Sequence, residues 1–136
     1  MGILGNIDDL ALDENKSLEG VPLELGAGRV IWVRQAGGHN RAIAWQGAAI
    51  AERMEKELEP LEARERDYRV HRALTAELLI SRWEGFESAT GEPVEYSPEA
   101  ALELLTASPD TLALVQEMAS STDAYRLARD KKKSKD

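Results

Sequence analysis

Few residues of this sequence have the type and spacing that chemistry requires. The chain has two histidines and no cysteine, so the candidate metal ligands or general bases begin with His39 and His71. Asp67 lies one helical turn before His71, but neither histidine belongs to an H-x-x-x-H pair. We therefore expect an exposed ion pair between Asp67 and His71, with no metal site and no cofactor.

Serines, acids and tryptophans are the remaining candidates for a site. Ser97 and Ser108 each precede proline, and because no G-x-S-x-G elbow surrounds them, we read both as helix caps. Acid–base catalysis by carboxylate pairs needs unequal, buried environments in a cleft, and we expect a solvated surface instead. The pairs in question are Glu84 with Glu87 and Glu92 with Glu95. The sequence thus predicts no catalytic residue and no enzyme.

The tryptophans have an alternative reading as a ligand platform. Trp32, Trp45 and Trp83 could stack on a ligand, but at least two of them stand in apolar runs at predicted element junctions. We expect those two to be core anchors.

The elements that must position these residues predict an α+β fold that is mostly α, with an N-terminal β-hairpin packed against about four helices. Two short apolar runs flank the turn Gly26-Ala27-Gly28, as in a hairpin. Asn40 is the predicted N-cap of the first helix, whose apolar residues recur every three or four positions. This stripe contains Ile43, Gly47, Ile50, Met54 and Leu58.

The expected organisation is one domain over residues 20–128, between two less structured ends. A flexible arm is predicted for residues 1–19 and a basic disordered tail for residues 129–136. The domain is divided into a hairpin at 21–34 and helices at about 40–58, 62–82, 98–107 and 109–126.

The segment from Trp83 to Leu105 has the most informative pattern. Trp83 and Phe86 bracket Gly85, so a sharp corner with two aromatic anchors is predicted. Ser97, Pro98 and an acid then give the order of residues that begins a helix.

The order W-E-G-F, a glycine-containing gap, V-x-Y-S-P-E and A-x-E-L-L resembles the tail assembly chaperones of long-tailed bacteriophages. A strand at 29–33 before a helix that opens with His39-Asn40-Arg41 also fits that family, and the likeness covers roughly residues 20–128. The residues that carry it most strongly are Trp83, Glu84, Gly85, Phe86, Gly91, Tyr96, Ser97, Pro98, Leu104 and Leu105.

The resemblance implies a non-enzymatic function in the host cytoplasm. Such a protein would bind the tape measure protein, help recruit subunits of the tail tube (major tail) protein, and be absent from the mature virion. The open alternatives are an acidic adaptor or inhibitor that binds one folded protein, and a small hydrolase.

Charge narrows the possible partners. Residues 83–125 contain nine carboxylates and no Lys or Arg, whereas residues 29–82 contain ten basic and eight acidic side chains. Since nucleic-acid affinity depends on neutralising phosphates, we expect no nucleic-acid binding by the C-terminal half. No apolar segment suits a signal or a membrane span, so no membrane partner is expected. The acidic surface either serves solubility or docks a basic or amphipathic protein.

One helix face is a specific candidate for a protein interface. Trp45 is displaced by about half a turn from the apolar stripe of its helix. With Ala48, Ala49 and Glu52 it would form an interaction face, open to a partner or to self-association. The alternative is a broader buried stripe that includes Trp45.

Overall fold

A computed structural model describes residues 2–127, and the basic tail expected at 129–136 lies outside these described residues. The predicted fold class is confirmed, because the chain is α+β, mostly helical, and has an N-terminal hairpin. A π-helix (Thr75–Leu79) and a 3-10 helix (Thr122–Tyr125) accompany the other elements. Those elements are α1 (Glu14–Glu19), β1 (Val21–Gly26), β2 (Arg29–Val33), α2 (Ile43–Leu58), α3 (Ala63–Leu74), β3 (Ile80–Glu84), α4 (Pro98–Ala107) and α5 (Pro109–Ala119).

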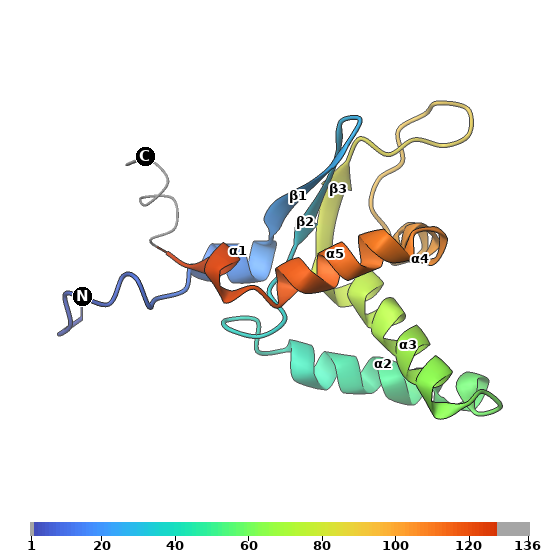
Figure 1. Cartoon of the computed structure of the whole chain (residues 1–136), viewed down its shortest axis with the longest axis horizontal. Coiled ribbons are helices and arrows are strands. Elements are labelled where there is room, and N and C mark those ends of the chain that lie inside the picture. The colour runs from blue at the N-terminus through green and yellow to red at the C-terminus, as the bar shows by residue number, and fades with distance from the viewer. Residues whose placement is uncertain (1, 128–136) are drawn as a thin grey trace.

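The three strands form one antiparallel sheet in the order β1-β2-β3. Ala27 and Gly28 make the hairpin turn with φ values of +55° and +78°, the conformation that two-residue hairpin loops favour. Figure 1 shows the sheet at one end of the molecule, the pair of α2 and α3 at the other, and α5 crossing between them.

β3 corrects the expectation of a single helix over residues 62–82. α3 ends at Leu74, the π-helix follows, and the chain becomes a strand that pairs with β2, so that Ile80 lies opposite Val33 and Trp83 opposite Ile31. All four of these side chains are buried. Pairing with the exposed edge of β2 satisfies backbone groups and buries both large side chains, which outweighs the local helical pattern.

The start of the first long helix also differs from the prediction. α2 begins at Ile43 rather than near residue 40, and no side chain caps it. Asn40 is buried and its Nδ2 donates to the carbonyl oxygen of Gln35 at 2.9 Å, so it fixes the preceding loop instead. The predicted stripe is correct, because all its members are buried or partly buried. Within it, a Cβ on Gly47 would lie 2.8 Å from Cδ1 of Leu74, so glycine permits the close approach of α2 and α3.

Part of the predicted flexible arm belongs to the folded body. The side chain of Asp13 accepts from the amide of Lys16 at 3.1 Å and caps α1. Ser17 is fully buried, and its hydroxyl donates to Oε1 of Gln35 at 2.6 Å. The flexible arm was predicted because the apolar residues of this segment show no sustained period, whereas in the structure its polar side chains form hydrogen bonds inside the fold.

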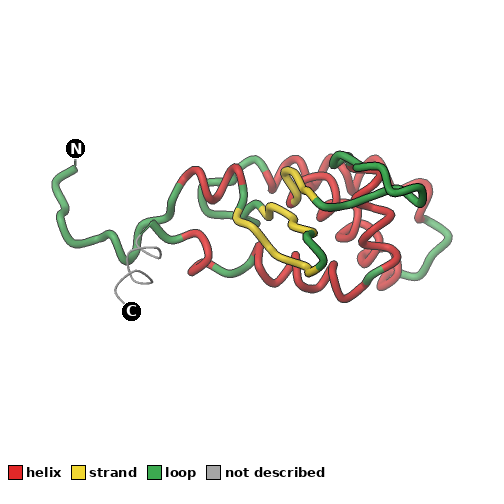
Figure 2. The backbone as a smooth tube through the Cα atoms, turned by 90° about the horizontal axis from the view of Figure 1, so that it is seen from above, coloured by secondary structure: helices red, strands yellow, loops and turns green. Residues whose placement is uncertain are grey.

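The core joins one face of the sheet to α4 and α5. Ile31 and Val33 of β2 are fully buried against Leu105 of α4 and Leu112 and Val115 of α5. Figure 2 shows the three strands from above, with helical segments running along both sides of them. One face of the hairpin is therefore covered by helices. The hairpin needs this packing because an isolated hairpin is marginally stable in water.

The buried Tyr125 allows a prediction of how the free energy of unfolding depends on pH. The side chain is fully buried, its hydroxyl donates to the carbonyl oxygen of Val33 at 2.9 Å, and burial raises its pKa well above the ordinary value. Tyr125→Phe should lower the free energy of unfolding at neutral pH by about 1–2 kcal/mol, because it leaves a buried carbonyl without its donor.

The stability of the same variant at alkaline pH can also be predicted, because the pKa of Tyr125 differs between the folded and the unfolded chain. Above about pH 10 the unfolded chain ionises this tyrosine while the folded chain keeps it neutral, so the stability present below pH 10 is lost as pH rises. Tyr125→Phe should reduce that loss, as measured by urea unfolding at neutral and alkaline pH. The control is Tyr68→Phe at an exposed tyrosine. An equal alkaline loss in the wild type and both variants would contradict the prediction.

Candidate protein-interaction surface

The four residues that the sequence predicts as an interaction face lie together on the solvent-exposed side of α2. The opposite side of the helix packs into the molecule through the buried residues Gly47, Ile50 and Leu58. Trp45 remains 65% exposed. The structure therefore places Trp45 outside the buried stripe, which excludes the alternative reading. The exposed residues Trp45, Ala48, Ala49 and Glu52 are called the Trp45 face below.

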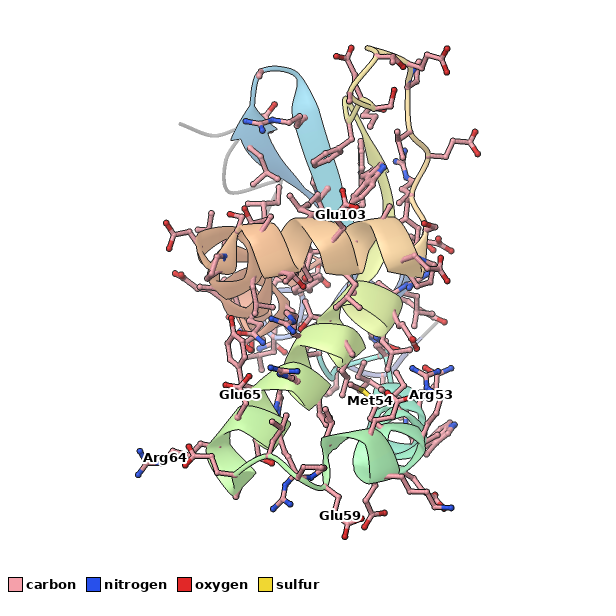
Figure 3. The ribbon with its side chains drawn as sticks, turned by 90° about the vertical axis from the view of Figure 1, so that its right-hand side faces the viewer. Arg53, Met54, Glu59, Arg64, Glu65 and Glu103 are labelled. Atoms are coloured by element: carbon pink, nitrogen blue, oxygen red, sulfur yellow. The ribbon has the colours of Figure 1, made fainter. Side chains whose placement is uncertain are left out.

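A shallow hollow continues this face along the helix. It has a volume of about 550 Å³ and is lined by Ala49, Glu52, Arg53, Glu55 and Lys56. Arg53 is partly fixed, because its Nη2 lies 2.7 Å from Oε1 of Glu77. Figure 3 shows Arg53 and Met54 on α2. An exposed indole beside small residues and mixed charges suits an amphipathic polypeptide better than a small polar ligand.

The corner predicted around Gly85 is an aromatic cluster. The rings of Trp83 and Phe86 stack with centroids 4.2 Å apart, and Tyr96 meets Trp83 edge-on at 5.7 Å. Nε1 of Trp83 donates to the carbonyl oxygen of Val94 at 2.9 Å. These contacts hold both ends of the loop 85–96 against the sheet.

Tyr96 ties the same loop to the π-helix. Its hydroxyl donates to the carbonyl oxygen of Ala76 at 2.6 Å. Burial raises the pKa of Tyr96, nearby Arg34 lowers it, and the carboxylates of Glu77 and Glu99 raise it further. The phenol therefore stays a neutral donor and has a structural function.

The other residues of the family-like motif also support the fold. Oγ of Ser97 accepts from the amide of Ala100 at 3.1 Å, and Pro98 is the first residue of α4. Leu105 is fully buried and Leu104 packs against the core. Gly85 and Gly91 have φ values of +87° and +86°, and Glu84 is exposed at the end of β3. The motif shapes a loop and a helix start.

The candidates for chemistry are not brought together. The ion pair expected between Asp67 and His71 is not formed among residues 2–127, because Nδ1 of His71 instead lies 2.8 Å from the backbone carbonyl oxygen of Asp67. His39 lies elsewhere, with Nε2 at 3.3 Å from the carbonyl oxygen of Leu12. Ser108 accepts from the amide of Thr111 at 3.3 Å and is the predicted cap of α5. Within the described part of the chain, no three His, Asp or Glu residues gather where they could hold a metal ion.

The carboxylates form a solvated surface. Every acid between Trp83 and Tyr125 is exposed, including the pairs Glu84 with Glu87 and Glu92 with Glu95. The loop that carries Glu87, Glu92 and Glu95 projects beyond the sheet (Figure 1). These exposed acids thus have no basic residue between them along the segment 83–125.

The three tryptophans do not form one platform. Trp83 is buried, while Trp32 is partly buried beneath Arg82, whose guanidinium carbon lies 3.7 Å from the ring centroid. Trp45 lies on α2 and is the exposed member of the three. The expectation that at least two would be core anchors is wrong, because among the described residues Trp83 is the tryptophan that belongs to the core, whereas Trp32 lies on the face of β2 opposite Ile31 and Val33.

A helix long and apolar enough to cross a membrane does not occur within residues 2–127. The fold defines a small α+β protein that is mostly helical. Its helix α2 exposes the large apolar side chain of Trp45 to solvent. The chain belongs to the family described as YdaY prophage protein, whose match extends over residues 39–136. It is therefore a phage-derived protein. No curated protein and no solved structure matches the chain.

Proposed function

We propose that this prophage protein is a non-enzymatic tail assembly chaperone that binds the tape measure protein through the Trp45 face. The exposed indole on α2 is the observation that carries the proposal, since Trp45 is 65% exposed and tryptophan is enriched among the residues that dominate binding at protein interfaces. The resemblance of the segment 83–105 to tail assembly chaperones and the prophage family support this choice of partner.

The mechanism is physical. A tape measure protein is long, helical and partly apolar, so an unassembled copy is prone to aggregate. Copies of this chain along it would cover apolar stripes with the Trp45 face, as in helix recognition by an apolar surface. The acidic segment 83–125 would remain outward and add repulsion between neighbouring complexes.

The cellular context follows from the same proposal. The protein acts in the host cytoplasm during tail morphogenesis, helps recruit tail tube subunits to the coated tape measure protein, and leaves before the tail is complete. No step changes a covalent bond, and no cofactor is required.

Trp45→Glu should abolish the stabilisation of the tape measure protein. The test is coexpression with the long open reading frame next to this gene, followed by copurification of a soluble complex. We expect the wild type to keep the long protein soluble and Trp45→Glu to lower the recovered complex at least about tenfold, because a charge replaces the central apolar anchor.

The matched control is Leu114→Glu, at an exposed leucine on α5. It adds the same charge to another helix and should leave the complex intact. A long protein that is equally soluble with and without this chain, or equal losses in the two variants, would contradict the proposal.

The exposed acidic loop favours a second candidate function, an adaptor or inhibitor that binds one folded basic protein. In that case Glu87→Gln and Glu92→Gln together would weaken binding and Trp45→Glu would not. A one-to-one complex with a folded protein, independent of the tape measure protein, would identify this alternative.

A further inference from the structure

The solvent-exposed side of α2 carries an apolar side chain and, further along the same helix, a hollow. Trp45 stands in the first turn of α2 and is 65% exposed. The hollow of about 550 Å³ lies closer to the C-terminal end of the helix and is lined by Ala49, Glu52, Arg53, Glu55 and Lys56. Its volume is within the range of about 300–1,000 Å³ that holds drug-sized molecules, so one indole side chain fits.

Trp45 does not fill the hollow of its own helix. Side chains of a helix lean toward its N-terminus, so the indole leans away from the hollow. The lining does not include Trp45, and Lys56 at the far end of the lining lies eleven residues further on, about 16 Å along the axis at about 1.5 Å per residue. Because both features belong to one continuous helix, they stay apart within a copy and can meet only between copies.

The charges along α2 select an antiparallel partner. Residues 25–51 contain no Asp or Glu, and the exposed Arg41 lies four residues before Trp45. Residues 52–59 contain four acids and two bases, and one of these bases, Arg53, is already bound to Glu77 at 2.7 Å. The helix dipole has the same polarity, because it is positive at the N-terminus. Two antiparallel copies therefore place unlike charges opposite each other, whereas two parallel copies place like charges together.

The residues between the indole and the hollow permit a close approach. Ala48 and Ala49 are exposed, so the side chains at the centre of the face are methyl groups. Lys56 forms no ion pair among residues 2–127, so its ammonium group is available to the ring of a facing tryptophan. Figure 1 shows α2 along the outer edge of the molecule, with its packed side toward α3. A second copy can therefore lie along the outer side of α2.

We propose that two free copies of the chain pair their α2 helices antiparallel, about a two-fold axis near Ala49, so that Trp45 of each copy fills the hollow of the other. Both copies use the same surface, so the contact closes on itself and gives a dimer rather than a chain. As a regulation of the proposed function the inference rests on that function, because the dimer covers the face that would bind the tape measure protein. One helix from each copy makes a small interface, so the dimer opens when a longer partner competes for the face.

Cross-linking tests the antiparallel pairing, because the chain has no cysteine of its own. Under mild oxidation, Ala49→Cys near the axis should link to a second copy of itself at several times the yield of Lys56→Cys. A mixture of Arg41→Cys and Lys56→Cys should link more than either variant alone, because these positions lie opposite each other in the antiparallel pair. If Lys56→Cys linked to itself as readily as Ala49→Cys, the proposal would be overturned.

Sedimentation of the purified protein tests the anchor without any other partner. Trp45→Ala should raise the dissociation constant of self-association at least about tenfold, because it removes the side chain that fills each hollow. The matched control is Tyr68→Ala, at an aromatic residue of α3 that is 41% exposed, and it should leave self-association unchanged. A wild type that stays monomeric at high concentration, or equal losses in the two variants, would overturn the proposal.

The oxidised and reduced forms of Ala49→Cys separate this inference from the proposed function. The tape measure protein is diluted from urea into either form, and its soluble fraction is measured, with oxidant-treated wild type as the control. We expect the reduced form to keep several times more of the long protein soluble than the disulfide-locked dimer does. Equal protection by both forms would overturn the dimer as the state that covers the Trp45 face. Protection by neither form, together with a dimer in sedimentation, would overturn the proposed function alone and support the dimer.

Discussion

Gly85→Ala is expected to lower the free energy of unfolding by roughly 2–5 kcal/mol, which combines backbone strain with a steric clash. Gly85 has a φ of +87°, a conformation that costs an alanine about 1–2 kcal/mol. A Cβ there would also run into the carbonyl oxygen of Gly28 and lie 2.8 Å from Cα of Arg29. Both atoms belong to the backbone of the hairpin turn, so relief requires the hairpin itself to shift. Urea unfolding measures the loss as a lower midpoint at an unchanged slope.

Gly91→Ala is the matched control for this substitution. Gly91 has nearly the same φ, +86°, but a Cβ at that position would meet nothing within 4 Å. It should therefore show the conformational cost alone, about 1–2 kcal/mol. Equal losses at the two positions would mean that the approach of the corner to the hairpin turn does not matter.

The corner shows how far the sequence could predict the fold. Gly85 between Trp83 and Phe86 indicated a turn with aromatic anchors, and Ser97 and Ser108 indicated the starts of α4 and α5, because these signals act within a few residues of the chain. Local chemistry of this kind does not depend on distant partners.

β3 could not be predicted in the same way. The sequence of residues 75–84 continues a helical pattern, and its strand conformation depends on pairing with β2, which lies some fifty residues earlier in the chain. The buried bond between Ser17 and Gln35 is similar, because neither residue has an apolar pattern around it that indicates burial. Long-range pairing overrides local preference at such positions.

The candidate interface was only partly predictable. The displacement of Trp45 from the stripe of α2 indicated its exposure, since helix geometry alone separates the two faces. The hollow of about 480 Å³ that residues of α3 and α5 line was not predictable, because it forms where residues from two helices far apart in the sequence meet.

Two tryptophans of this chain separate stability from binding. Trp83 is 9% exposed, stacks on Phe86 and donates to Val94, whereas Trp45 projects from α2. Trp83→Ala should lower the free energy of unfolding by about 3–5 kcal/mol, since it leaves a large cavity between the sheet and the loop 85–96. Trp45→Ala should change it by no more than about 0.5 kcal/mol, because the side chain buries little in the folded monomer.

The variant Trp83→Phe separates the contribution of the hydrogen bond to Val94 from that of the apolar packing of Trp83. The phenyl ring keeps much of the apolar contact with Phe86 but lacks the donor to the carbonyl oxygen of Val94, so we expect about 1–2 kcal/mol of the loss to come with this variant. Denaturant unfolding of the three variants, followed by circular dichroism, gives the comparison. If Trp45→Ala destabilised the chain as much as Trp83→Ala, the indole on α2 would be an anchor of the fold, and the case for a protein partner at that face would fail.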